Sequence, residues 1–96
     1  MRLTSFEVQS IKKAFLETFE DGKIYLFGSR TDDTKRGGDI DLYLCPLQKF
    51  DDERIRRRRF LILLDEYIGE QKIDAVIAKD ENRLIEQIAK RDGIEL

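Results

Sequence analysis

The chain has 96 residues, 41% of them hydrophobic and 40% charged, and its formal net charge is −2 at pH 7. This length predicts a single domain over residues 1–96, and so small a net charge excludes a global field that would recruit nucleic acid or an anionic membrane. The sequence has no histidine and no apolar run of about 18 residues, which excludes histidine catalysis, histidine metal sites and a membrane-spanning helix.

The first predicted element is a helix that begins at Thr4 or Ser5, since either hydroxyl can cap it. Its buried face is defined by apolar residues at helical spacing: Val8, Ile11, Phe15 and Phe19. The dipeptide Asp21-Gly22 ends this helix, and residues 23–27 (KIYLF) then form a first strand.

A polar loop over residues 30–38 leads to a second strand, residues 39–45 (DIDLYLC). A strand alternates its side chains, so Asp39 and Asp41 project from the same face. Aspartate is disfavoured in strands and two like charges at this distance repel, so we expect positive charge beside the pair. Cys45 is the only cysteine and cannot form an internal disulfide, which is typical of a cytoplasmic protein.

The second half of the chain begins with a long helix over residues 51–67, followed by a third strand over residues 72–78 (KIDAVIA). A last helix covers residues 81–90 and ends by Gly93. The apolar stripe of the long helix is expected to consist of Ile55, Phe60, Leu64 and Tyr67.

This order of elements predicts an α/β (α+β) fold, a small mixed β-sheet with helices packed on one face. The helix-covered face would carry Ile40, Leu42 and Ile73. The opposite face would carry the two aspartates of the second strand and, if the second and third strands are neighbours, Asp74 as well.

The segment 54–59 (RIRRRR) favours a solvated or partner-facing helix over a nucleic-acid patch. Its four consecutive arginines sweep about 300° around a helix and cannot form one basic face. Asp52 and Arg56, and likewise Glu53 and Arg57, have the i,i+4 spacing of surface ion pairs.

The three aspartates supply oxygen ligands, the type that suits Mg²⁺. Two such ions about 3.5–4 Å apart can clamp the attacking and leaving oxygens of nucleotidyl transfer. Upstream, Gly28 lets backbone approach a phosphate closely, and Ser29 offers a hydroxyl donor. A triphosphate could therefore bridge this turn and the metal ions.

Residues 28–41, GSRTDDTKRGGDID, resemble the signature of the nucleotidyltransferase superfamily related to DNA polymerase β. That signature is Gly-Ser or Gly-Gly, a gap, then Asp-x-Asp or Asp-x-Glu, with a third carboxylate on a later strand. The separated parts and their strand contexts must coincide, so the pattern is specific. The whole chain also has the length and element order of the minimal nucleotidyltransferases, which are usually encoded beside a helical HEPN partner.

The resemblance implies a role for each matching residue: a nucleotide-binding turn of Gly28, Ser29 and Arg30, and catalytic metal ligands Asp39, Asp41 and Asp74. Two departures concern the loop. Asp32-Asp33 stand where many relatives have a second glycine, and Gly38 replaces a serine that often precedes the aspartate pair.

The implied activity is transfer of AMP from ATP to a hydroxyl, with pyrophosphate released and two Mg²⁺ ions, or Mn²⁺, as cofactors. The acceptor would be a hydroxyl of a HEPN toxin, which makes the chain a protein adenylyltransferase and an antitoxin, in a homo- or hetero-oligomer. One alternative is a catalytically weak subunit that masks its HEPN partner. Another is a nucleotidyltransferase for a small molecule such as an antibiotic.

Several of these residues also have a structural interpretation. The carboxylates could form ion pairs with neighbouring cations, namely Lys35 or Arg36 beside the aspartate pair and Lys72 beside Asp74. Arg30 would contact a substrate or partner, or else pair with Asp32 or Asp33. Tyr25 and Tyr43 are expected to pack in the core or at its rim rather than stack on a base.

Overall fold

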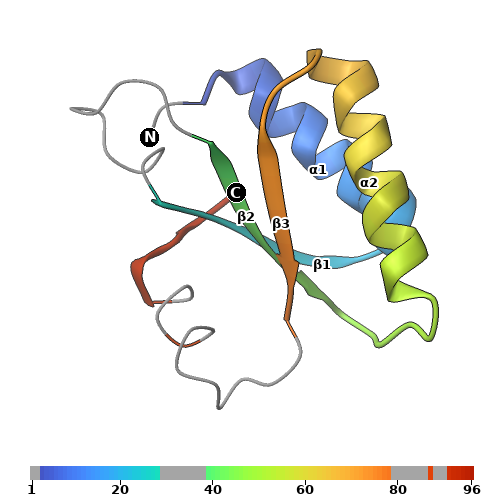
Figure 1. The fold of residues 1–96 in the computed structure, drawn as a ribbon. Coiled ribbons are helices and arrows are strands. Elements are labelled where there is room, and N and C mark those ends of the chain that lie inside the picture. Colours follow the sequence, from blue (N-terminus) through green and yellow to red (C-terminus); the bar gives the residue numbers. More distant parts are fainter. Residues whose placement is uncertain (1–2, 29–38, 79–86, 88–90) are drawn as a thin grey trace.

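The computed structural model describes residues 3–28, 39–78, 87 and 91–96 (Figure 1). Its elements, in chain order, are α1 (Ser5–Phe19), β1 (Gly22–Phe27), β2 (Ile40–Pro46), α2 (Glu53–Ile68), β3 (Ile73–Ile77) and β4 (Ile94–Glu95). The first five elements confirm the predicted order, with bounds that differ by one or two residues. The predicted loop 30–38 and nearly all of the predicted helix 81–90 lie outside the described residues.

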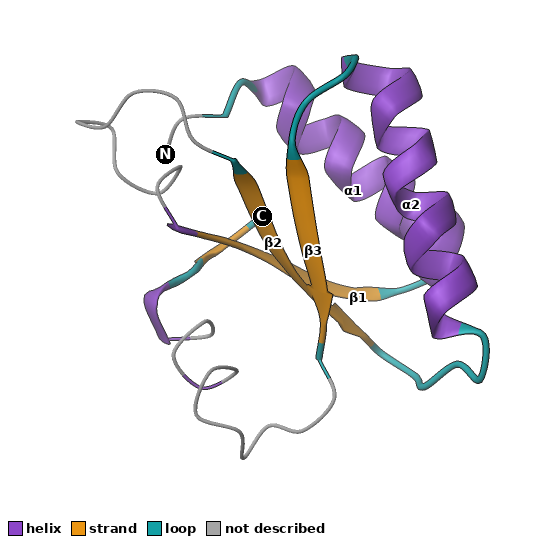
Figure 2. Cartoon of the chain, in the orientation of Figure 1, coloured by secondary structure: helices purple, strands orange, loops and turns teal. Residues whose placement is uncertain are grey.

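The strands form a mixed four-stranded sheet in the order β3-β2-β1-β4. β1 pairs antiparallel with β2 and with β4, whereas β2 and β3 run parallel. Both helices pack on the same face of this sheet (Figure 2), which confirms the predicted small sheet with helices on one face. Among the described residues, no helix is both long enough and apolar enough to cross a membrane.

α1 begins with a reciprocal pair of hydrogen bonds between Thr4 and Glu7. The Thr4 hydroxyl accepts a bond from the Glu7 backbone N–H at 3.0 Å, and the Glu7 carboxylate accepts one from the Thr4 N–H at 2.9 Å. These bonds satisfy donors that the first helical turn otherwise leaves without partners. Thr4 is therefore the cap, and Ser5 is the first residue of the helix.

The core lies between the two helices and the sheet. Its buried residues come from both helices and from the three longer strands: Ile11, Ala14, Phe15, Phe19, Ile24, Leu26, Ile40, Leu42, Leu44, Phe60, Leu64, Ala75 and Ile77. The prediction for Ile55 is wrong, because this side chain is 59% exposed. Ile55 lies five positions before Phe60 in the helix, which turns it about 140° away from the buried stripe.

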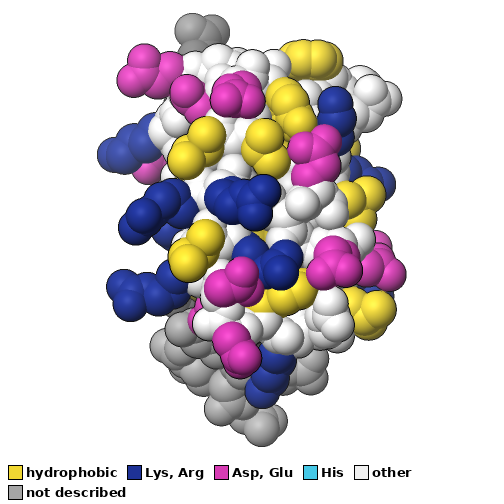
Figure 3. Space-filling model, turned by 90° about the vertical axis from the view of Figure 1, so that its right-hand side faces the viewer, with side chains coloured by type: hydrophobic (Ala, Val, Ile, Leu, Met, Phe, Trp, Pro, Cys, Tyr) yellow, Lys and Arg dark blue, Asp and Glu magenta, His cyan; other side chains and the backbone are white. Residues whose placement is uncertain are grey.

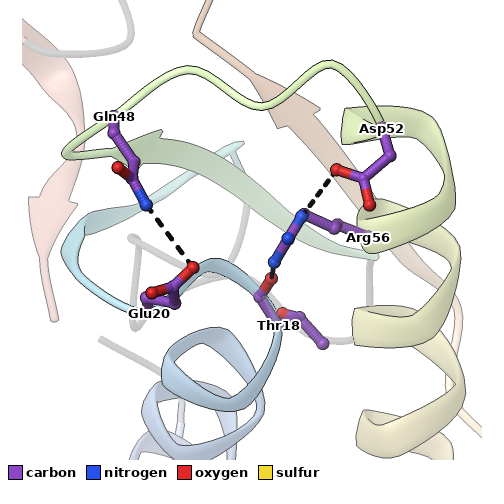
Figure 4. A network of polar contacts seen from close by, with 5 residues as sticks. All are labelled: Thr18, Glu20, Gln48, Asp52 and Arg56. Carbon is purple, nitrogen blue, oxygen red and sulfur yellow. Dashed lines mark hydrogen bonds and ion pairs between the residues drawn. The ribbon is translucent and has the colours of Figure 1, made fainter.

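Arg56 joins the beginning of α2 to the end of α1 (Figure 4). Its Nε donates to the Asp52 carboxylate at 2.7 Å and its Nη1 donates to the Thr18 carbonyl at 2.7 Å. The guanidinium also stacks 3.8 Å from the ring centre of Phe50. The i,i+4 pair Asp52–Arg56 is therefore confirmed, and Arg56 is a packed residue rather than a solvated one.

Replacing Arg56 by lysine should destabilise the fold. A lysine ammonium lacks the planar fork that reaches Asp52 and Thr18 together, so we expect a loss of about 1–2 kcal/mol, seen as a lower Tm. Arg56 holds the pKa of Asp52 below its ordinary value, so the contribution of the pair should disappear as the pH falls through that lowered pKa. Arg58→Lys is the matched control. Equal melting temperatures for the two variants near neutral pH would contradict this account of Arg56.

Candidate functional site

Four of the six predicted site residues lie at one end of the sheet. β1 ends at Phe27, directly before Gly28, and the antiparallel register places Phe27 opposite Asp41 in β2. β3 runs parallel to β2 and begins at the same end, so Asp41 also faces Asp74. Asp39 immediately precedes β2. Ser29 and Arg30 lie outside the described residues, and their predicted roles stay predictions.

The aspartates lie on the face of the sheet that α1 and α2 do not cover. Ile40 and Leu42 are fully buried toward the helices, so the alternating pleat turns Asp41 to the other side. The side chain of Asp74 is 65% exposed and that of Asp39 is 43% exposed. This arrangement confirms that β2 and β3 are neighbours and that their carboxylates share an open face.

The two outer carboxylates act electrostatically on Asp41. Burial raises the pKa of its carboxyl above the ordinary value, and the negative charges of Asp74 and then Asp39 raise it further. Each cause disfavours the ionised form of Asp41. The site therefore favours the approach of positive charge at this carboxylate.

Two cations contact the outer carboxylates. Lys72 Nζ lies 3.7 Å from Asp39 Oδ2, and Arg57 Nη2 lies 3.7 Å from Asp74 Oδ1. Among the described residues, no cation lies within ion-pair distance of Asp41. Within the described ranges, positive charge therefore lies beside both outer carboxylates, whereas Lys35 and Arg36, the cations expected beside the aspartate pair, lie outside the described residues.

Arg57 is the residue that the sequence did not reveal. Its Nε also donates to the Ala75 carbonyl at 2.6 Å, so it contacts two consecutive residues of β3. Arg57 belongs to an arginine run on α2 and lies far from Asp74 in the sequence. No local sequence pattern therefore links the two residues. The predicted neighbour of Asp74, Lys72, pairs instead with Asp39.

Gly28 lies against the carboxylate of Asp41. Its φ is +82°, a conformation that L side chains rarely adopt, and a Cβ at this position would collide with Asp41 Oδ2. Glycine at residue 28 therefore permits both the turn and the close approach of backbone to the carboxylate.

The aspartates at this end of the sheet offer oxygen donors only, which is the donor type that Mg²⁺ prefers. In the part of the chain that the structure describes, no three Asp, Glu, Cys or His side chains lie close enough together to share one ion. Lys72 and Arg57 engage the outer two carboxylates at present. A divalent cation shared by Asp41 and one outer aspartate would compete with the basic side chain that contacts that outer carboxylate.

The two tyrosines near the site pack against one another. Tyr43 is 1% exposed, and its ring centre is 6.4 Å from that of the half-buried Tyr25. The prediction that Tyr43 packs rather than stacks on a base is confirmed. Cys45, farther along β2, is partly buried.

Comparison with known families adds a finding that is independent of this geometry. A family model described as a nucleotidyltransferase domain matches residues 8–96. The match runs from the first turns of α1 through β4 and includes every predicted site residue. No curated protein matches the chain.

Asp41→Asn should raise the Tm of the protein in the presence of a chelator. Because the folded-state pKa of Asp41 is raised, its ionisation costs stability as the pH rises through that pKa, and a neutral amide removes this cost. The gain should be present near neutral pH and should shrink as the pH falls through the raised pKa of Asp41, where the native carboxyl becomes protonated. The control, Asp65→Asn on exposed α2 surface, should show no such pH-dependent gain. A Tm gain that is unchanged by pH would contradict the electrostatic cause.

Gly28→Ala should destabilise the protein and displace the Asp41 carboxylate. The positive φ alone costs an alanine about 1–2 kcal/mol, and the collision adds to it. In an Asp41→Ala background the collision disappears but the backbone strain remains, so Gly28→Ala should cost less there. Urea unfolding of the four proteins of this double-mutant cycle measures the difference. Strict additivity would show that Gly28 and Asp41 are not in contact.

Proposed function

The chain belongs to the nucleotidyltransferase domain family, and on that premise we propose that it transfers AMP from ATP to a hydroxyl in a Mg²⁺-dependent reaction. The observation that carries this proposal is the register of β2 on β3. It sets Asp41 opposite Asp74 on an open face, with Gly28 against the Asp41 carboxylate. A fold that needed only stability would gain nothing from paired carboxylates at this position.

Each aspartate has a role in this proposal. Asp39 and Asp41 would hold Mg²⁺ through carboxylate oxygens, and Asp74 would share in holding it. Bound Mg²⁺ would supply the positive charge that offsets the triphosphate and polarises its α-phosphoryl group. Lys72 and Arg57 would release the outer carboxylates when the ion binds. The repulsion between the carboxylates, which contributes to the raised pKa of Asp41, favours that exchange.

The proposed transfer forms one bond and breaks another at the α-phosphorus of ATP. The acceptor oxygen bonds to that phosphorus, and the bond from the phosphorus to the oxygen bridging to the β-phosphate breaks, so pyrophosphate leaves with the bonding electrons. Asp74 takes the proton of the acceptor hydroxyl on a carboxylate oxygen. Its 65% exposed side chain is the carboxylate of the site most accessible to an incoming acceptor.

The turn after β1 is the proposed phosphate site. Because Gly28 has no side chain, its backbone lies close to the Asp41 carboxylate, and the same property would let it approach a bound phosphate. By the family resemblance, Ser29 and Arg30 would complete it with a hydroxyl, a backbone N–H and a guanidinium. Their part in the proposal depends on sequence alone.

The proposed acceptor is a hydroxyl on a HEPN toxin, which the modification would silence, so that the chain acts as an antitoxin. The exposure of Asp39 and Asp74 supports a large acceptor, because a protein-borne hydroxyl can reach an open face. A second candidate function is a weakly catalytic subunit that masks the same partner. The ion pairs Lys72–Asp39 and Arg57–Asp74 support it, because they occupy two of the proposed metal ligands.

Radiolabelled AMP transfer to a co-purified HEPN protein tests the proposal. Native protein should label the partner with Mg²⁺ and not with chelator. Asp41→Asn and Asp74→Asn should each reduce the rate on the order of 100-fold or more. Asp65→Asn should keep the native rate.

Native labelling by Asp41→Asn would overturn the assignment of the site. Stable complex formation without any labelling would favour the masking subunit. Labelling of an aminoglycoside instead of the protein would move the acceptor to a small molecule.

A further inference from the structure

A groove of about 500 Å³ runs between α2 and the outer edge of β3. One wall is the α2 segment that contains Glu53, Arg54, Arg57, Arg58 and Leu61, and the other wall is residues 74–77. β3 is the first strand in the sheet order, and no described strand pairs with its outer edge. The groove thus has a size that can enclose part of a ligand and a wall that belongs to an edge strand.

The basic side chains of the groove differ in their engagement. Arg57 is held by the Ala75 carbonyl at 2.6 Å and by Asp74 at 3.7 Å. Arg54 and Arg58 are exposed, and neither has a carboxylate within ion-pair distance among the residues described. Arg54 and Arg58, which flank Arg57 in the helix, can therefore contact an anionic ligand.

The rest of the lining consists of two carboxylates, Glu53 and Asp74, of which Asp74 is paired with Arg57, and of an apolar part. Leu61, Ala75, Val76 and Ile77 contribute to it, and Val76 is 41% exposed, although it lies in a strand. Figure 3 shows basic, hydrophobic and acidic side chains interleaved on the α2 side of the molecule. A ligand that fits such a lining presents both carboxylates and at least one apolar side chain.

We propose that this groove docks an acidic, extended segment of a partner protein. Carboxylates of the segment would contact Arg54 and Arg58, and an apolar side chain would cover Val76. Arg57 already occupies the central outward carbonyl of β3, so the segment is held mainly by its side chains rather than by full strand addition.

A protein segment fits the lining better than a single-stranded nucleic acid does. No described residue that lines the groove is aromatic, so bases have no stacking platform. The apolar wall at Val76 matches an aliphatic side chain rather than a sugar-phosphate chain. This inference goes beyond nucleotidyl transfer and does not depend on it, although a docked segment would pass Asp74 of the candidate site.

Selection from a library of random short peptides displayed on phage, with immobilised native protein, tests the inference. The selected peptides should be enriched in Asp and Glu next to an aliphatic residue. A fluorescein-labelled synthetic copy should bind with a Kd that rises with salt concentration. Calorimetric or circular-dichroism melting confirms that each variant is folded.

Arg58→Glu and Arg59→Glu form a matched pair, because adjacent residues of α2 undergo the same charge change and only Arg58 lines the groove. Arg58→Glu and Arg54→Glu should each weaken peptide binding by about tenfold or more, whereas Arg59→Glu should change it little. Peptides without acidic enrichment would overturn the inference, and so would equal losses from Arg58→Glu and Arg59→Glu. A competition with a mixed-sequence oligonucleotide gives a further test. If the oligonucleotide displaces the labelled peptide as effectively as unlabelled peptide does, the groove binds polyanions in general and the inference is overturned.

Discussion

The register of β2 is the constraint on which both the core and the candidate site depend. Alternation along this strand sends Ile40, Leu42 and Leu44 into the core and turns Asp41 to the opposite face. A slip by one residue would bury the aspartate under the helices and expose the three aliphatic side chains. The same choice of register that closes the core therefore fixes where the carboxylates lie.

Packing away from the site compensates for the repulsion between the carboxylates. The aromatic side chains of α1 and α2 fill the helix-covered side of the sheet, and Arg56 joins the two helices through a backbone carbonyl. On the face with the aspartates, Tyr43 is also buried, at 1% exposed. Functional sites typically contain groups that repel one another and that the packing of the surrounding structure holds together.

Local patterns in the sequence were sufficient to predict most of the fold. Helical spacing and a capping residue predicted α1, and alternation predicted the strands that carry the aspartates. The prediction failed for Ile55, where hydrophobicity was given more weight than helical angle. It also missed β4, because two residues paired with β1 have no pattern of their own. Arg57 could not be assigned to Asp74 at all, since that contact depends on how α2 lies against the edge of the sheet.

The two contacts of Arg57 join the outer edge of β3 to the carboxylate face. One guanidinium donates to the Ala75 carbonyl and forms an ion pair with Asp74. Any cation that takes over Asp74 weakens one of the two contacts that hold Arg57 in place, and so makes the strand edge more accessible. Thermodynamic linkage requires the reverse as well. Whatever draws Arg57 away from the edge leaves Asp74 without this ion pair and so raises its affinity for another cation.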